Sequence, residues 1–164
     1  MYRVVCLAVL GIGVLSLCGA EPADEPDSFV VGSWELDRGN VAVHDVGMAY
    51  ADRERVVINN GAYPNTAEYD IEFPVDARYR VDGRYAAADS RPVDLIVDDA
   101  VVARGFAGTT GSWESSTAIW ERLCEVDITA GKHTVKLVCP GSCIPHIVAL
   151  RFVSNTTAPQ WHPR

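Results

Sequence analysis

The chain has 164 residues, with 14 lysines and arginines against 22 aspartates and glutamates, and its formal net charge is −8. A chain this acidic repels phosphate backbones, so we exclude nucleic acid as a partner. After residue 20 no stretch is apolar enough to cross a bilayer, and we expect no membrane span. The cysteines and histidines lack the paired spacing of a zinc finger.

Residues 1–20 have the pattern of an export signal. Arg3 supplies a positive start, residues 4–17 are almost wholly apolar, and Cys18-Gly19-Ala20 follows where a signal peptidase cuts. We therefore expect a secreted, periplasmic or cell-surface protein, and removal of the signal changes the charge to −9 because one arginine leaves. A buried core helix is a weaker alternative. A lipid anchor on Cys18 is also weaker, since Leu17 precedes this cysteine where a lipoprotein signal requires a small residue.

The remaining chain divides into three parts. Residues 21–28 are acidic and rich in proline, and we expect a disordered leader. Residues 29–154 form one predicted domain, and residues 155–164 form a C-terminal tail. About 144 residues remain after the signal, which is enough for one domain with a buried core.

Alternation of apolar and polar residues, the pattern of a strand with one solvated face, recurs through the predicted domain. The clearest runs are 68–73, 78–85, 93–97, 124–128, 134–137 and 148–152, with shorter candidates at 41–43, 56–58 and 101–102. No stretch keeps helical spacing for three turns. About eight or nine short strands, with turns roughly every ten residues, predict an all-β fold, an antiparallel β-sandwich or a barrel.

Three segments between these runs predict turns. Residues 74–77 (Pro-Val-Asp-Ala) separate two alternating runs and predict a hairpin connection. Asp98-Asp99 predicts a turn into the short strand at 101–102. Residues 129–132 (Thr-Ala-Gly-Lys) predict another change of direction.

Three cysteines, Cys124, Cys139 and Cys143, follow the signal. Cys139 and Cys143 bracket a Pro-Gly-Ser turn, so a local disulfide is our candidate pairing in an oxidising compartment. Cys124 belongs to an alternating run and is expected to be a buried, unreactive thiol. A pairing of Cys124 with either of the other two remains open.

The sequence offers no catalytic signature. It lacks the nucleophile elbow, the zinc-protease helix motif and the glycine-rich phosphate loop. The histidines are scattered, and the carboxylates fall mostly on the outer faces of strands and in turns. We therefore predict a protein that is not an enzyme; a hydrolase, the minority alternative, would need two carboxylates that converge in a cleft.

Aromatic residues in loops point towards binding. Trp113 follows a run of small residues, and Tyr50 and Tyr63 also fall in loop-like stretches. An exposed indole is costly unless a ligand covers it, and sugars have apolar C–H faces that stack on such rings. Trp113 could equally cap the end of the core, and the sequence weighs these two roles evenly.

Short motifs recur in a fixed order along most of the domain, at 38–41, 67–71, 84–93, 110–113, 130–135 and 145–147. In order and spacing they resemble the carbohydrate-binding modules of families 6 and 35. The resemblance implies a jelly-roll, galactose-binding-like β-sandwich. It also implies that Trp113 stacks on the sugar and that His146 forms a hydrogen bond with it. A second aromatic residue is usual at the position of Val57, so Tyr50 and Tyr63 are our candidates to replace it.

Relatives in these families often bind a structural calcium through a Glu-x-Glu pair near the first strand. The matching stretch here is Gly32-Ser33-Trp34, with Glu35 displaced, and Val148 stands where an acidic residue is frequent. A structural calcium therefore stays open. Two functions compete: an exported, non-catalytic module that binds an oligo- or polysaccharide weakly through a loop tryptophan, and an exported sandwich that has lost the sugar site and serves a protein partner or a structural role.

Overall fold

A computed structural model of the protein describes residues 28–156. The predicted signal peptide, residues 21–27 of the leader and residues 157–164 of the tail lie outside this range. Within it the chain forms eleven strands and two short 3-10 helices, η1 (Ser33–Glu35) and η2 (Ser115–Thr117). Neither of these helices is long and apolar enough to span a membrane.

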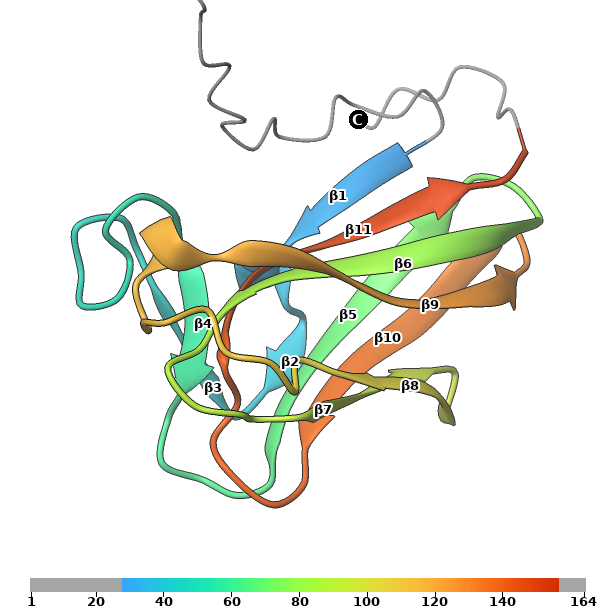
Figure 1. The fold of residues 1–164 in the computed structure, drawn as a ribbon. Coiled ribbons are helices and arrows are strands. Elements are labelled where there is room, and N and C mark those ends of the chain that lie inside the picture. The colour runs from blue at the N-terminus through green and yellow to red at the C-terminus, as the bar shows by residue number, and fades with distance from the viewer. Residues whose placement is uncertain (1–27, 157–164) are drawn as a thin grey trace, which may run out of the picture.

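The strands form two antiparallel sheets that pack face to face (Figure 1). The order in the first sheet is β3 (Val41–His44), β4 (Val56–Asn59), β11 (His146–Ser154), β6 (Ala77–Ala86) and β9 (Ile119–Ile128), and β1 (Ser28–Gly32) also pairs with β11. The order in the second sheet is β2 (Arg38–Gly39), β5 (Asn65–Phe73), β10 (Gly131–Cys139), β7 (Val93–Val97) and β8 (Ala100–Gly105). This arrangement confirms the predicted antiparallel β-sandwich.

Every run that alternation predicted as a strand is a strand in the structure. β1 and β2 were not predicted, because β1 shows no clean alternation and β2 has only two residues. The turn at Asp98-Asp99 is confirmed: β7 pairs with β8, and both aspartates have positive φ, 47° and 68°, as a two-residue hairpin turn of type I′ requires.

The predicted hairpin at residues 74–77 is wrong. β5 pairs with β2 and β10, whereas β6 pairs with β9 and β11, so the segment crosses from one sheet to the other. The physical reason is that both strands are strongly amphipathic. Each buries its apolar face most completely against the opposite sheet, as the inward rings of Tyr69 and Tyr79, both 1% exposed, show.

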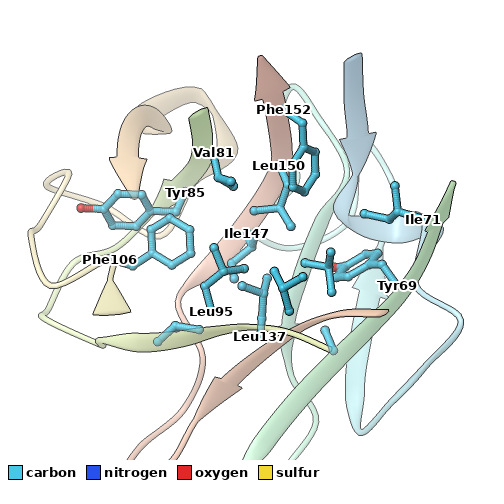
Figure 2. Packing of buried hydrophobic residues seen from close by; sticks show 14 of the residues in the cluster. Tyr69, Ile71, Val81, Tyr85, Leu95, Phe106, Leu137, Ile147, Leu150 and Phe152 are labelled. Atoms are coloured by element: carbon cyan, nitrogen blue, oxygen red, sulfur yellow. The ribbon is translucent and has the colours of Figure 1, made fainter. Parts of the chain in front are cut away.

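The core fills the space between the two sheets. Figure 2 shows side chains of both sheets in one cluster, including Tyr69 and Leu137 from the second sheet and Val81, Ile147 and Leu150 from the first. Each of these five is at most 1% exposed. Among the described residues no buried side-chain nitrogen or oxygen lacks a hydrogen-bond partner. The core is therefore continuous and well satisfied, and it provides a rigid support for the loops at its ends.

The predicted disulfide between Cys139 and Cys143 is not formed, and all three cysteines of the described chain are free thiols. The two sulfur atoms have different environments. Cys139 is buried at the end of β10, where its Sγ contacts backbone carbonyls of Pro92 and Cys143. The Sγ of Cys143 instead lies 2.8 Å from the hydroxyl of Tyr63. Cys124 is half-buried on β9, and burial raises the pKa of its thiol, in keeping with an unreactive group.

Candidate functional site

Three of the four predicted sugar-binding residues meet at one end of the sandwich. Tyr50 lies in the loop between β3 and β4, Trp113 in the loop between β8 and β9, and His146 at the first position of β11. The rings of Tyr50 and His146 have centroids 4.6 Å apart, and those of His146 and Trp113 are 5.0 Å apart. Residues far apart in the sequence thus form one continuous cluster of rings.

Two further side chains extend this cluster into a row. The ring of His44, at the end of β3, is nearly parallel to Tyr50, with 6.5 Å between the centroids. At the other end the guanidinium carbon of Arg91 lies 3.8 Å from the centre of the Trp113 ring. We call His44, Tyr50, His146, Trp113 and Arg91 the aromatic row.

His146 occupies the middle of the row and is 6% exposed. Its Nδ1 lies 2.6 Å from the backbone carbonyl oxygen of Trp113. A carbonyl can only accept, so Nδ1 carries the proton and Nε2 of the neutral ring is an acceptor. Burial lowers the pKa of His146, with only partial compensation from that hydrogen bond, so the ring is neutral at neutral pH. A neutral imidazole suits a partner that donates hydrogen bonds, such as a hydroxyl group.

Trp113 is half-buried and packs against the core, and Arg91 covers one of its faces. The same guanidinium donates from Nε to Asp89 at 2.7 Å, and Asp89 is 65% exposed. Trp113 therefore caps the end of the core, one of the two roles that the sequence weighed evenly. Because its ring is only half-buried, the other role, stacking on a sugar, stays a prediction. Tyr50, at 39% exposure, is the more open ring of the row.

Hydrogen bonds from one buried serine hold the two loops together. Ser115 is fully buried, and its backbone N–H donates to the carbonyl of Tyr50 at 2.9 Å. Its hydroxyl accepts from the backbone N–H groups of Arg53 and Glu54 at 2.9 and 3.0 Å and donates to Asp52 at 2.8 Å. Hydrogen bonds from Ser116 and from Ser115 lower the pKa of the Asp52 carboxyl to about 2. The loops of Tyr50 and Trp113 are therefore positioned as a unit.

The backbone at Tyr50 is unusual, because its φ is 68°, in the left-handed region that few residues other than glycine and asparagine adopt. The carbonyl of Tyr50 accepts from Ser115, as described above, and this bond helps to hold the conformation. Such local strain is frequent where a side chain must be presented in one direction.

Tyr63, the fourth predicted residue, makes no ring contact with the row. It is 59% exposed, and its hydroxyl bonds to the Sγ of Cys143, which raises the pKa of the phenol. Cys143 lies in the loop that leads into β11 and His146, and Arg91 is close enough to act electrostatically on both Tyr63 and His146. The sugar-binding role of all four residues stays a prediction.

The stretch that the resemblance matches to a calcium site has no carboxylate pair. The hydroxyl of Ser33 donates to the carbonyl of Ile147 at 2.6 Å, and the carbonyl of Ser33 accepts from the hydroxyl of Tyr69. Val148 is buried and offers no side-chain oxygen. Within residues 28–156 no group of three or more His, Cys, Asp or Glu side chains is arranged to hold a metal ion. The residues present therefore do not fit the calcium site of the relatives.

Sequence reasoning missed His44 and Arg91. His44 is only one of the scattered histidines in the sequence, because its ring contact with Tyr50 depends on the path of the β3–β4 loop. Arg91 is only part of a motif, because its partner Trp113 lies on another loop. Val57, at the position where relatives usually have a second aromatic residue, is buried in β4 and pairs with Ile147. A side chain at this position is therefore not exposed to a ligand. An arginine among polar residues carries no local signal that would identify it as a neighbour of tryptophan.

Comparison with protein-family models found no match, and comparison with curated proteins also found none. The fold, in contrast, is similar to many solved structures. A family 35 carbohydrate-binding module from Paenibacillus barcinonensis superposes with a TM-score of 0.64 at 20% identity, covering 77% of this chain and 99% of that one. The C-terminal family 6 module of LamC from Zobellia galactanivorans gives 0.60 at 19% identity, covering 78% and 100%.

The GH26-CBM35 β-(1,4)-mannanase of Podospora anserina is also similar, with a TM-score of 0.66 at 13% identity. The match covers 82% of this chain but only 29% of the mannanase chain. The modules themselves are matched over almost their full length. The chain therefore has the fold of the family 6 and family 35 carbohydrate-binding modules, as its sequence motifs predicted.

Proposed function

We propose that the protein is an exported, non-catalytic carbohydrate-binding module that binds an oligo- or polysaccharide at the aromatic row. The observation that carries this proposal is the convergence of Tyr50, His146 and Trp113, from two loops and the start of β11, at one end of the sandwich. The ring of Tyr50 stacks on the C–H face of a sugar, and the exposed part of Trp113 borders the same sugar. The nature of the solved modules with this fold supports the assignment.

Polar groups of the row fix the orientation of the sugar. The guanidinium of Arg91 donates hydrogen bonds to hydroxyl oxygens, and Nε2 of neutral His146 accepts one from a hydroxyl. Tyr63 makes a peripheral contact through the neighbouring loop. One stacking ring and a few hydrogen bonds of about 1 kcal/mol each give roughly −4 to −6 kcal/mol. This corresponds to dissociation constants from about millimolar to tens of micromolar.

Affinity electrophoresis on a panel of soluble polysaccharides, with and without calcium, tests the proposal. Tyr50→Asn removes the ring but tolerates the positive φ at this position, so we expect lost retardation with an unchanged fold. Trp113→Ala should also abolish retardation, and it should lower stability because the ring packs on the core. Tyr63→Ala should weaken binding less than Tyr50→Asn.

The matched control is Val101→Thr, which alters a residue that is 64% exposed beside the β7–β8 turn. This variant should migrate like the wild type on every polysaccharide. Absence of retardation on the whole panel, or retardation that survives Tyr50→Asn and Trp113→Ala, would refute sugar binding at the aromatic row.

A second candidate function is a β-sandwich interaction domain without a sugar site. Val46 and Met48 favour it, because they are 59% and 50% exposed on the same loop as Tyr50. Apolar residues clustered at a loop tip are frequent at protein interfaces. Met48→Ser separates the two functions: it should leave sugar retardation unchanged if the aromatic row alone binds sugar.

A further inference from the structure

A groove of about 600 Å³ is lined by residues of β1 in the first sheet and β5 in the second. Figure 1 shows where these two strands lie in the sandwich. Its apolar lining includes Val31 from β1 and Tyr69 and Ile71 from β5. Figure 2 shows the last two side chains directed from β5 towards the core. Glu35 and Asp37 line the groove where the chain crosses from one sheet to the other. Tyr69 and Ile71 are only 1% and 6% exposed, so this apolar floor is the edge of the hydrophobic core, and the more exposed apolar lining is on β1, where Val30 is 51% exposed.

One wall of the groove is an incompletely paired strand edge. β2 pairs with β5 only at Glu68 and Ala67. Asp37 extends the pairing slightly, because its N–H donates to the carbonyl of Glu68 at 2.9 Å and its carboxylate accepts from the N–H of Asp70 at 2.7 Å. Backbone groups alternate in direction along a strand, so those of Glu72 face the same edge, beyond the end of β2.

The rim of the groove is acidic. Four of its lining residues, Glu35, Asp37, Asp70 and Glu72, are carboxylates, and none is lysine or arginine. Asp70 is paired with a neighbouring arginine and lysine at 2.7 and 3.2 Å. Among residues 28–156 no ion pair involves the other three carboxylates, so their charge is available to a cationic partner.

We propose that this groove binds an extended segment of a partner protein in which apolar residues alternate with lysine or arginine. The backbone of the segment continues the line of β2 and bonds to Glu72 on β5, in the manner of strand addition. Every second side chain covers the apolar floor, and the intervening basic side chains reach the carboxylates of the rim. An acidic segment is excluded by charge, and a helix is excluded because it has no free backbone groups for β5.

The probe is a fluorescein-labelled synthetic peptide of alternating valine and lysine, added to the full protein while fluorescence anisotropy is followed. We expect saturable binding that weakens as salt is raised. A peptide of the same length with glutamate in place of lysine should not bind, and one with proline at its centre should bind much more weakly.

Glu72→Pro removes the backbone N–H that the segment needs, at a position of β5 beyond the end of β2, where this N–H faces no described strand and proline is tolerated. We expect the affinity for the valine–lysine peptide to fall about tenfold, as the loss of a backbone hydrogen bond and one charge predicts. Glu72→Gln is the matched control, since it keeps the N–H and should cost only a few-fold. Glu35→Lys reverses one rim charge without touching β5 and should also weaken binding.

Several results would overturn this proposal. Equal affinity for the lysine and glutamate peptides would mean that the rim charge is irrelevant. Binding unaffected by both Glu72→Pro and Glu35→Lys would place the peptide elsewhere. A dimer in sedimentation that Glu72→Pro dissociates would show that a second copy fills the groove, and competition by a peptide of residues 157–164 would assign it to the chain itself. Tyr50→Asn should leave peptide binding intact, so failure of the sugar site is distinguishable.

Discussion

Replacement of Ser115 by alanine should affect both stability and sugar binding, although its fully buried side chain is not part of the aromatic row. The hydroxyl accepts from the backbone N–H groups of Arg53 and Glu54, at 2.9 and 3.0 Å. Alanine leaves both donors without this acceptor, at about 1–1.5 kcal/mol each. Loss of the bond to Asp52 adds little, because that exposed carboxylate still accepts the N–H of Ser116. We therefore expect a loss of about 2–3 kcal/mol.

Urea unfolding followed by tryptophan fluorescence measures this loss as a lower midpoint with an unchanged slope. Ser142→Ala, in an exposed loop, is the control and should be within about 0.5 kcal/mol of the wild type. The Ser115 hydroxyl also ties the loop of Trp113 to Arg53 and Glu54 in the loop of Tyr50, so its loss should reduce retardation on the best polysaccharide in affinity electrophoresis. A Ser115→Ala protein with wild-type stability and retardation would show that these hydrogen bonds do not position the site.

Three further outcomes follow from the structure. Leu137→Ala should destabilise the protein by about 2–5 kcal/mol in the same urea experiment, because its side chain is fully buried, and an equally stable variant would contradict the core. The pKa of His146 is lowered in the folded state, so its contribution to stability is fully present above the unfolded-state pKa of about 6.5 and is lost as pH falls through the lower folded-state pKa. His146→Gln should therefore flatten this part of the plot of unfolding free energy against pH. A thiol reagent should modify half-buried Cys143 before buried Cys139 in the native protein. If neither thiol reacts until a reductant is added, the predicted disulfide between them is present.

The sequence by itself determined the class of fold and most of the strands. Alternation in a run such as Tyr69-Asp70-Ile71 is a local property, since it gives a strand one face that water avoids. The turn at Asp98-Asp99 is equally local, because aspartate tolerates the positive φ that a short hairpin requires. The order of the short motifs further predicted the sandwich fold of the family 6 and family 35 modules, and the similarity to solved modules confirms that fold.

Tertiary structure alone decided which strands pair and which side chains meet. Residues 74–77 have the composition of a hairpin, but burial of the apolar faces of β5 and β6 against opposite sheets makes them a crossover. Cys139 and Cys143 are close in sequence, yet one thiol is directed into the core and the other towards Tyr63. Such outcomes depend on packing between distant segments, which the local pattern does not encode.

The aromatic row shows the same division. The sequence marked Trp113, His146 and Tyr50 as candidates, since each has a chemistry that suits a sugar. It could not show that Arg91 covers one face of Trp113 or that Ser115 ties two loops together, because these contacts join residues 22 and more positions apart. The sequence gives the type of each residue directly, whereas the distance between two loops is set only when the two sheets pack on their common core.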